Sequence, residues 1–417
     1  MLLSHKTTIH VNEEESNLLG HMCYAAYKLW NVCNYERRHV KELELKEYPD
    51  WYYQKKAHKD DLWYKSLPSQ TAQEICKLLD KSWKSFYKLQ ETGGIKNPRP
   101  PRFKQDKIPI TYMQNGMKHT PGEGRVRLSL PRQLVGFMKD TYGISAQFVT
   151  IENQIFECTD IIKQIKIYPP REDGTTELIV IYESKEPEFL PDNGRYLSID
   201  LGLHNLMSCY DNQGKGFIVG RQYLAICQRY DQEIARLQSQ WGKIQASHGV
   251  KYPKPSAHVL KLYKKKRDTV HDYLHKMTHY VVEYCKKEEI HTVVVGDITG
   301  IREDKDLGHV TNQKLHSLPY RSIYIMLEYK LAMEGIRFIK QEESYTSQCS
   351  PMAKTVGKRT AEKSQRVKRG LYKEGKSCYN ADMVGAYNIL RKHLKGAKRE
   401  AELPLTLSSP TVIKVAV

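Results

Sequence analysis

Apolar residues in the first ninety positions recur at the three-and-four spacing that is typical of amphipathic helices. A helix is predicted from about Glu13 to Leu45, and a second over TAQEICKLLDKSWKSFYKLQ with Ser69 as its N-cap. The segment between them, which contains YPDWYYQKKAHKDDLWYK, is predicted to be a loop. A short strand is expected at residues 3–11. These patterns predict a small helical module with its lysines facing solvent.

Between residues 108 and 190 the hydrophobic period falls towards two, which indicates β-structure. Strands are predicted at RVRLSLPRQL, FVTIENQIFECTD, QIKIYPP and ELIVIYESK, with REDGTT as a hairpin turn. They would form a small β-barrel or sandwich, which the strand at residues 3–11 could join. The Pro- and Gly-containing segment EPEFLPDNG then sets a domain boundary near residue 190.

The second half opens with three strands in GRYLSIDLGLHNLMSCYDNQGKGFIVG, residues 194–220. Long helices are predicted at about 222–247 and 256–288, followed by the buried strand HTVVVGDITG and the loop IREDKDLGHVTNQK. A helix at about 319–334, the strand GIRFIKQEESYTS and the helix NADMVGAYNILRKHLKG complete the series. This order, with carboxylates at the strand exits, is that of an RNase H-type fold. The tail after about residue 400 has no periodic signal.

Acidic residues at the strand ends are the candidate chemistry of this half. An acid such as Asp200, which ends an apolar strand, is costly unless it is paired, hydrogen-bonded or metal-bound. Two-metal phosphodiester hydrolysis needs several hard oxygen ligands that converge on ions roughly 4 Å apart. The candidate ligands are Asp200, Asp297, Glu342, Glu343 and Asp382. Taken singly, each is more often a solvated or capping carboxylate; Asn380 could be an N-cap, with Asp382 an ordinary first-turn acid.

A net charge of +18 predicts a polyanionic partner, the alternative being a generally basic, solvated surface. The 28 tyrosines suit stacking on bases and ribose, although many will be core. The segment GGIKNPRPPRFKQDK at 93–107 is either a solvated linker or a loop that contacts nucleic acid, and a second basic segment spans 353–377. The candidate nucleic-acid-binding residues are Arg99, Arg102, Lys104, Lys264, Lys265, Lys266, Arg267, Lys358, Arg359, Arg366, Lys368 and Arg369.

The apolar runs and the cysteines bear on the cellular compartment. No apolar run approaches a membrane span, and MLLSHKTTIH is too short and too polar for a secretory signal. The nine cysteines are scattered, odd in number and form no C-x-x-C pair, which favours a reduced cytosol.

Four motifs in combination, SIDLGLHNL, VVVGD, EESYTSQCS and NADMVGAYNILRK, resemble the TnpB family of transposon-encoded, RNA-guided DNA endonucleases. The sequence also resembles the related compact type V CRISPR effector nucleases, and LPSQTAQEICKLLDKSWKSFYKL and PRPPRFK add family-like features at the N-terminal side. The resemblance covers nearly the whole chain. It implies a RuvC-like nuclease domain that follows an oligonucleotide-binding (wedge) β-barrel with an inserted helical recognition module.

The resemblance also implies a division of the chain and a set of partners. The wedge-type barrel would take residues 1–12 and 93–190, the recognition module 13–92, the nuclease domain 191–344 and 378–400, a basic insert 345–377, and a tail 401–417. A guide RNA would pair with one strand of double-stranded DNA, and the protein would read a short adjacent motif. Two Mg²⁺ or Mn²⁺ ions would serve one nuclease site in a prokaryotic, nucleoid-associated protein, with the oligomeric state left open.

Two departures from the family pattern stand out. Most of the family has Glu where this chain has Gly296, so either the nuclease is dead or another acid replaces that Glu. Glu343 is the expected replacement, because its strand should lie beside the 291–297 strand with both ends pointing the same way. The resulting ligand set is Asp200, Glu343 and Asp382, with Glu342 and Asp297 as alternates.

The second departure concerns zinc. The family's two C-x-x-C pairs are absent here, because Met352 stands where a partner of Cys349 would be and Cys378 is alone. No structural zinc is expected, and the basic residues of 353–377 are expected to contact nucleic acid instead. A transposase that acts without RNA and a guide-independent hydrolase are weaker alternatives, since recombinase-type nucleophiles are not apparent and the basic N-terminal half would be unexplained.

Overall fold

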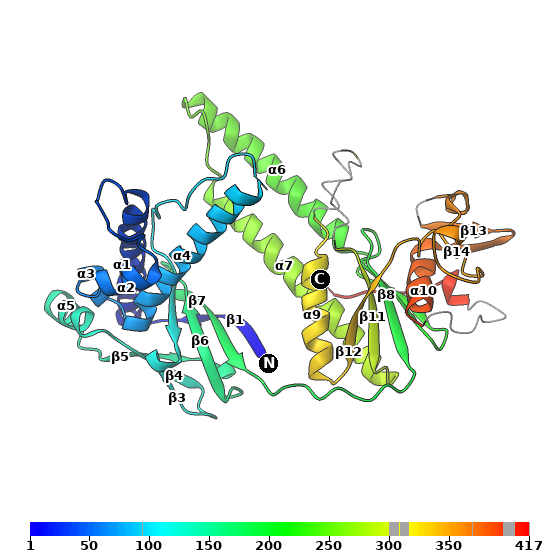
Figure 1. Ribbon diagram of the computed structural model, residues 1–417, viewed down its shortest axis with the longest axis horizontal. Coiled ribbons are helices and arrows are strands. Elements are labelled where there is room, and N and C mark those ends of the chain that lie inside the picture. Colours follow the sequence, from blue (N-terminus) through cyan, green and yellow to red (C-terminus); the bar gives the residue numbers. More distant parts are fainter. Residues whose placement is uncertain (94, 300–307, 309–316, 369, 395–404, 417) are drawn as a thin grey trace. The chain divides into compact units, whose positions relative to one another are not determined.

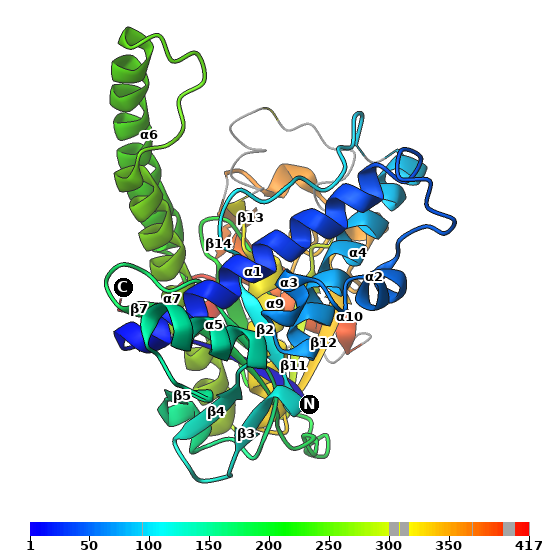
Figure 2. The same cartoon turned by 90° about the vertical axis from the view of Figure 1, so that its left-hand side faces the viewer.

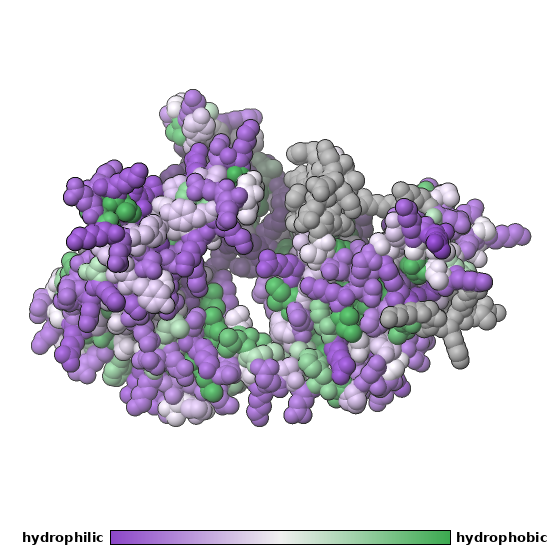
Figure 3. All heavy atoms as spheres, viewed as in Figure 1, coloured by the Kyte–Doolittle hydropathy of each residue, from purple (hydrophilic) through white to green (hydrophobic). Residues whose placement is uncertain are grey.

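The computed structural model describes residues 1–93, 95–299, 308, 317–368, 370–394 and 405–416 (Figure 1). The chain forms two compact units, Met1–Glu186 and Pro187–Val417. The predicted loop IREDKDLGHVTNQK lies outside the described residues, apart from Gly308. No helix in the described part of the chain is long and apolar enough to cross a membrane. Hydrophilic side chains cover most of the face of each unit seen in Figure 3.

The helices of the first unit are α1 (Glu13–Arg38), α2 (Trp51–Ala57), α3 (Leu62–Lys65) and α4 (Ser69–Thr92). A capping box starts α1, because Asn12 Oδ1 accepts from Glu15 N (2.8 Å) while Glu15 Oε2 accepts from Asn12 N (3.1 Å). The first helix ends at Arg38 rather than near Leu45, and the predicted loop contains α2 and α3, which are too short for a periodic signal. The N-cap of α4 is Pro68, one residue before the expected one.

Seven strands of the first unit form two sheets. A four-stranded antiparallel sheet has the order β1 (Leu2–His10), β7 (Thr175–Glu183), β6 (Ile161–Ile167), β2 (Ile110–Met113), so the N-terminal strand joins it. A three-stranded sheet contains β3 (Met117–His119), β4 (Arg125–Ser129) and β5 (Phe148–Glu152). Backbone pairing among the described residues keeps the two sheets separate and does not join them into one closed, hydrogen-bonded barrel.

Two predicted strands of this region are shorter than expected. The strand over RVRLSLPRQL stops at Ser129, and the unpredicted helix α5 (Arg132–Tyr142) begins after Pro131, its N-cap. The strand over FVTIENQIFECTD stops at Glu152, where the 3₁₀ turn η2 (Gln154–Phe156) takes over. In both segments the alternation of hydrophobic residues continues past a residue that caps a helical turn, Pro131 or Asn153, so the sequence predicts a longer strand than the one that forms.

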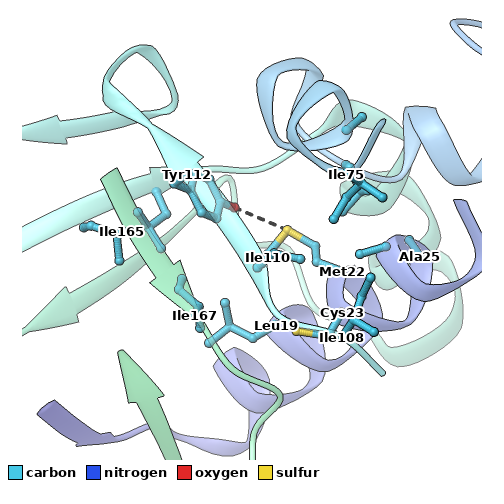
Figure 4. Packing of buried hydrophobic residues seen from close by; sticks show 14 of the residues in the cluster. Leu19, Met22, Cys23, Ala25, Ile75, Ile108, Ile110, Tyr112, Ile165 and Ile167 are labelled. Carbon is cyan, nitrogen blue, oxygen red and sulfur yellow. Dashed lines mark hydrogen bonds between the residues drawn. The ribbon is translucent and has the colours of Figure 1, made fainter. Parts of the chain in front are cut away.

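One hydrophobic core joins the helices and the four-stranded sheet of the first unit (Figure 4). Leu19 and Met22 of α1 pack towards Ile110 of β2 and Ile167 of β6 (Figure 4), and all four side chains are completely buried. The Tyr112 hydroxyl lies 3.3 Å from Met22 Sδ and 3.0 Å from the Ser129 carbonyl oxygen, so its polar tip is satisfied inside the core. Burying each such aliphatic side chain contributes about 1.5–3 kcal/mol.

The second unit is built on a six-stranded sheet with the order β12-β11-β8-β9-β10-β15. The strands are β8 (Tyr196–Asp200), β9 (Met207–Asp211), β10 (Gly216–Val219), β11 (Thr292–Asp297), β12 (Arg337–Glu342) and β15 (Thr411–Ile413). Strands β8, β9 and β10 are antiparallel neighbours, whereas β11 and β12 run parallel to β8. The carboxyl ends of β8, β11 and β12 therefore lie at the same edge of the sheet.

Helices cover both faces of this sheet. The helices are α6 (Tyr223–Ser247), α7 (Ala257–Lys287), α9 (Tyr320–Met333) and α10 (Ala381–His393). Helices α6 and α7 form a long hairpin (Figures 1 and 2), and α7 packs on α9. Alternate residues of β10 enter different cores, Phe217 towards α7 and Ile218 towards α10, as the strand period requires.

The remaining elements of the second unit are short. A hairpin of β13 (Leu371–Glu374) and β14 (Ser377–Asn380) precedes α10, and η3 (Lys358–Thr360) and η4 (Lys363–Gln365) lie before it. The tail has no periodic signal in the sequence, yet η5 (Leu405–Leu407) and β15 lie within it, and β15 pairs in parallel with β10. A three-residue strand is too short to produce a detectable period, which is why the sequence did not predict it.

Candidate active site

A cavity of about 800 Å³ opens at the carboxyl end of β8. Asp200, Glu343 and Asp382 line it, although 182 residues separate the first from the last in the sequence. Its other charged lining residues are Arg221 and Arg366. The fold thus brings together the three acids that the sequence predicts as ligands.

Asp200 is the last residue of β8, and its carboxylate packs against the backbone of α10. A Cβ at Gly385 would overlap Asp200 Oδ2, so the absence of a side chain there makes room for the carboxylate. Burial raises the pKa of Asp200 well above its usual range, and the charges of Glu343 and Asp382 raise it further against the opposing effect of Arg366. A neutral acid is therefore favoured here unless a cation compensates the charge.

Glu343 follows β12 directly and reaches back over the neighbouring strand. Strands β11 and β12 are parallel, as predicted, with Gly296 opposite Gln341 and Asp297 opposite Glu342. A Cβ at Gly296 would overlap Glu343 Oε2 and lie 2.9 Å from Ile389 Cδ1. The carboxylate of Glu343 consequently fills the space that a side chain at position 296 would occupy.

The environment of Glu343 disfavours its ionised form. Burial raises its pKa to about 7, with Asp297 and Glu342 adding to the rise and Lys392 opposing it. Within the described residues, Glu343 Oε2 is buried without a hydrogen-bond partner. Such an oxygen is costly in a folded protein and is a natural ligand for a cation.

Asp382 lies in the first turn of α10. Asn380 is the N-cap, because its Oδ1 accepts from the backbone N–H groups of Asp382 (3.1 Å) and Met383 (3.2 Å). The Asp382 side chain nevertheless points to the cavity, where Oδ2 accepts a hydrogen bond from Asn205 Nδ2 (2.7 Å) and Oδ1 lies 3.8 Å from Arg366 Nη2. The two interpretations of this residue, a first-turn acid and a site residue, are therefore compatible.

The two alternate acids are in different surroundings from Glu343. Partial burial acts to raise the pKa of Glu342, but its ion pair with Lys392 and the hydrogen bond from Ser344 N lower it overall. For Asp297, hydrogen bonding to Thr299 likewise outweighs burial and lowers the pKa. Neither Glu342 nor Asp297 is among the described residues that line the cavity. Geometry and charge both favour Glu343.

The resemblance implies divalent ions, for which the oxygen atoms of these acids are the available donors. Among the described residues, no three His, Cys, Asp or Glu side chains converge closely enough to form a single metal cage. The unpartnered Glu343 Oε2 and the crowded, buried Asp200 carboxylate are nevertheless hard oxygen donors of the kind that Mg²⁺ prefers. The types of donor therefore suit Mg²⁺, although no compact three-ligand group is present among the described residues.

The basic residues proposed to bind nucleic acid fall in several places. Lys264, Lys266 and Arg267 line a cavity of about 730 Å³ beside α7, and Lys265 is exposed next to them. Arg366 lines the carboxylate cavity, Lys358 and Arg359 lie in η3, and Lys368 forms an isolated β-bridge with Leu371. Arg369 lies outside the described residues.

The loop that contains Arg99, Arg102 and Lys104 packs on α1 rather than extending as a free linker. Trp30 Nε1 donates to the Arg102 carbonyl (3.2 Å), and Lys104 Nζ lies 4.6 Å from the centre of the Trp30 ring. Asn31 exchanges two hydrogen bonds with the Lys104 backbone, at 2.8 and 3.0 Å. All three basic residues line one groove of about 400 Å³ with Trp30.

The segment that follows Glu343 is fixed by polar groups of α10 that the sequence did not single out. The buried Asn388 donates to the carbonyl oxygens of Thr346 (2.8 Å) and Cys349 (2.9 Å). The Cys349 thiol is buried and lies 3.4 Å from the Gly357 carbonyl, whereas Cys378 is exposed on β14. The sequence did not single out Asn205 either, which lies three residues after the Asp-Leu-Gly step.

Comparison with known proteins agrees with the motifs. Residues 179–302 match a family model described as a probable transposase, OrfB_IS605, and residues 320–389 match a model described as the Cas12f1-like TNB domain. The chain is therefore similar to the TnpB family and to compact type V effectors, which confirms the resemblance stated above. No curated protein matches the sequence.

A solved structure that aligns at a TM-score above 0.5 shows a similar fold, and two others align more weakly. A Cas12f1–sgRNA–target DNA complex aligns at a TM-score of 0.57 and 14% identity, over 90% of this chain and 82% of that chain. CasPhi-2 (Cas12j) bound to crRNA and phosphorothioate DNA aligns at 0.42 and 9%, over 96% and 93%. C2c1 of Alicyclobacillus acidoterrestris with single-guide RNA aligns at 0.44 and 9%, over 90% and 66%.

Proposed function

We propose that the protein is an RNA-guided DNA endonuclease with one RuvC-like site composed of Asp200, Glu343 and Asp382. The observation that carries the proposal is the convergence of these three acids in one cavity at the carboxyl edge of the sheet. The strand order β10-β9-β8-β11-β12, with the last two parallel to β8, supports an RNase H-like assignment. The match to the transposase family model over residues 179–302 supports the same class.

The division of labour follows the resemblance. Residues 1–12 and 93–190 would act as the wedge domain, 13–92 as the recognition module, 191–344 and 378–400 as the nuclease domain, and 345–377 as a basic insert. The described strand β15 adds part of the 401–417 tail to the nuclease sheet. The net charge of +18 and the groove beside Trp30 suit a guide RNA and a double-stranded DNA target with a short adjacent motif.

Asp200, Glu343 and Asp382 would hold two divalent ions, which would supply an activated water and stabilise the leaving oxygen. Asp200 and Glu343 have raised pKa values, so at neutral pH a bound cation competes with protons for them. Arg366, which lines the same cavity, carries positive charge to where a phosphodiester would lie. A prokaryotic cytoplasm with nucleoid association is the compartment that this activity implies.

Guide dependence can be tested on the purified protein. RNA that copurifies is sequenced, and DNA matched to it is offered to the complex before and after RNase treatment. Cleavage of matched DNA that disappears with the RNA supports guidance. Cleavage that persists without RNA favours a guide-independent hydrolase, and copurification without any RNA favours a transposase that acts alone.

A second candidate is an RNA-guided DNA-binding repressor without nuclease activity. Two observations favour it: Gly296 stands where most of the family has Glu, and the described acids form no compact three-ligand group. A complex that binds matched DNA but never cuts it in Mg²⁺ or Mn²⁺ would establish this alternative. If the protein cuts, full activity of Glu343→Gln would instead assign the third ligand to Glu342 or Asp297.

A further inference from the structure

We infer that Asn205 and Arg221 form a positioning relay for Asp382: Arg221 orients Asn205, and Asn205 fixes the Asp382 carboxylate for a divalent cation. The inference rests on the proposed nuclease function and deepens it. Neither residue belongs to the ligand set of Asp200, Glu343 and Asp382. Both line the same cavity as those acids.

Two hydrogen bonds connect the three side chains in series. Arg221 Nε donates to Asn205 Oδ1 at 3.1 Å, and Asn205 Nδ2 donates to Asp382 Oδ2 at 2.7 Å. A guanidinium can only donate and a carboxylate can only accept, so these neighbours allow one orientation of the Asn205 amide. Asn205 is only 7% exposed, which limits the competition of water for either bond.

The backbone around these residues is shaped to make the relay. Gly220 has φ +90°, and a Cβ there would lie 2.6 Å from Leu206 Cβ, so a glycine is needed for the turn that presents Arg221. Gly202 permits the turn after β8, because a Cβ there would lie 2.9 Å from the Asn205 carbonyl oxygen. Asp382 is held from the other side by the first turn of α10.

The relay leaves one oxygen of Asp382 for a ligand. Oδ2 is engaged by Asn205, whereas the partner of Oδ1 among the described residues is the more distant Arg366 Nη2 at 3.8 Å. Fixing Oδ2 sets the plane of the carboxylate and therefore the direction in which Oδ1 points. Hydrogen-bonding partners of this kind around a metal ligand typically change metal affinity or activity by about 10–100-fold.

The test compares Mn²⁺ binding by calorimetry and the half-saturating Mg²⁺ concentration for cleavage, both on the full-length protein with its guide RNA. Asn205→Leu, which keeps the approximate size but removes both hydrogen bonds, should weaken Mn²⁺ binding about tenfold. Arg221→Ala should weaken Mn²⁺ binding less than Asn205→Leu does. Arg221→Lys should keep most of the wild-type Mn²⁺ affinity. The double variant should lose no more than Asn205→Leu alone, because Arg221 acts through Asn205.

Two matched controls separate positioning from general damage. Arg229→Ala removes an exposed arginine from α6, the helix that begins just after Arg221, and Asn212→Ala removes an asparagine of the turn between β9 and β10 whose side chain hydrogen-bonds the backbone of Gly194 and Tyr196. Both should leave Mn²⁺ affinity unchanged. Any of three results would overturn the relay. These are unchanged Mn²⁺ affinity in Asn205→Leu and Arg221→Ala, additive losses of affinity in the double variant, and a wild-type protein that binds no Mn²⁺.

A variant that fails to fold, and a failure of the proposed function, can each be distinguished from a failure of the relay. Arg221 is exposed, so Arg221→Ala decides the matter if Asn205→Leu does not fold. If the wild type binds Mn²⁺ and the relay variants bind it more weakly, yet matched DNA is not cut, the relay stands and the nuclease proposal fails.

Discussion

At the residue scale, the site depends on a missing side chain. Gly296 leaves space on β11, and Glu343 fills that space from the end of β12. The Glu343 carboxylate would thus take the place of the Glu that most of the family has at position 296, but it starts from the neighbouring parallel strand. The raised pKa of Glu343, about 7, distinguishes it from Glu342 and Asp297, whose pKa values are lowered.

Adding one methyl group should therefore disturb the site. In Gly296→Ala the new Cβ would overlap Glu343 Oε2 and crowd Ile389, so we expect cleavage to fall at least about tenfold while binding of matched DNA persists. Gly242→Ala is the control, since Gly242 lies within α6 and nothing lies within 4 Å of a Cβ there. The control should keep full activity and gain roughly 0.5–1 kcal/mol of stability. Wild-type cleavage by Gly296→Ala would contradict the close contact.

Exchanging the two residues tests the substitution directly. Glu343→Gly alone should abolish cleavage, because it removes the third carboxylate. The double variant Gly296→Glu/Glu343→Gly should recover measurable cleavage, since its carboxylate again starts from the adjacent parallel strand. Rates of cutting of matched DNA in Mg²⁺ provide the comparison. No recovery in a well-folded double variant would count against a shared position for the two carboxylates.

The motifs allowed Asp200, Glu343 and Asp382 to be predicted as a set, since strand exits and parallel pairing bring such residues to one edge. Asn205 could not be predicted as a partner of Asp382, because a hydrogen bond between residues 177 positions apart leaves no local pattern. The burial of Asn388 inside α10 was equally invisible, since its partners are backbone carbonyls of another segment.

At the element scale, a buried ionic group ties the short helices α2 and α3 to α1. His58 Nε2 lies 2.9 Å from Glu36 Oε2, and His58 Nδ1 contacts Asp61 Oδ2. Burial alone would lower the pKa of His58, but the two carboxylates outweigh it and raise the pKa to about 9. The protonated histidine therefore helps to hold a segment that the sequence predicted to be a loop.

This group makes the stability of the first unit depend on pH. The folded pKa of about 9 exceeds the usual 6.5, so the stabilisation is complete below pH 6.5 and is lost as pH rises through 9. A shift of this size corresponds to roughly 3 kcal/mol. Tryptophan fluorescence during urea unfolding reports it, because four of the five tryptophans lie in this unit: Trp30, Trp51, Trp63 and Trp83.

The variant His58→Gln should flatten this pH dependence between pH 6.5 and 9, whereas His5→Gln, on the exposed face of β1, should retain it. Equal slopes for the wild type and His58→Gln would show that another group is responsible.

The strand β15 gives a second prediction at this scale. Val412 pairs with Ile218, so Val412→Pro removes a backbone N–H from the parallel ladder and should destabilise the second unit by about 1–2 kcal/mol. Hydrogen exchange should accelerate at the amides of β10, which would become an edge strand, and remain slow in β11. Unchanged exchange in β10 would mean that β15 contributes little to the sheet.

Long elements with a strong period, such as α6, α7 and the strands β8 to β12, were predictable because each repeats its pattern several times. The helices α2, α3 and α5 were missed for physical reasons. Two of them are seven residues or fewer, and the third starts directly after Pro131 within a run that also alternates like a strand. Their stability comes from tertiary packing rather than from local propensity.

At the scale of the whole molecule, two units with separate cores carry a net charge of +18. The first unit offers a basic groove beside Trp30, and the second offers the carboxylate cavity. An enzyme that binds nucleic acid broadly and cuts it at one place needs a strongly basic surface together with an acidic, partly desolvated site.

The most direct measurement is the cutting of matched double-stranded DNA by the purified protein–guide RNA complex, with Mg²⁺ and with EDTA, for the wild type and Asp200→Ala. We expect the wild type to cut only in Mg²⁺. In Asp200→Ala the rate of cutting should fall at least about a thousandfold, with target binding retained. Equal cutting by Asp200→Ala, or cutting in EDTA, would contradict it.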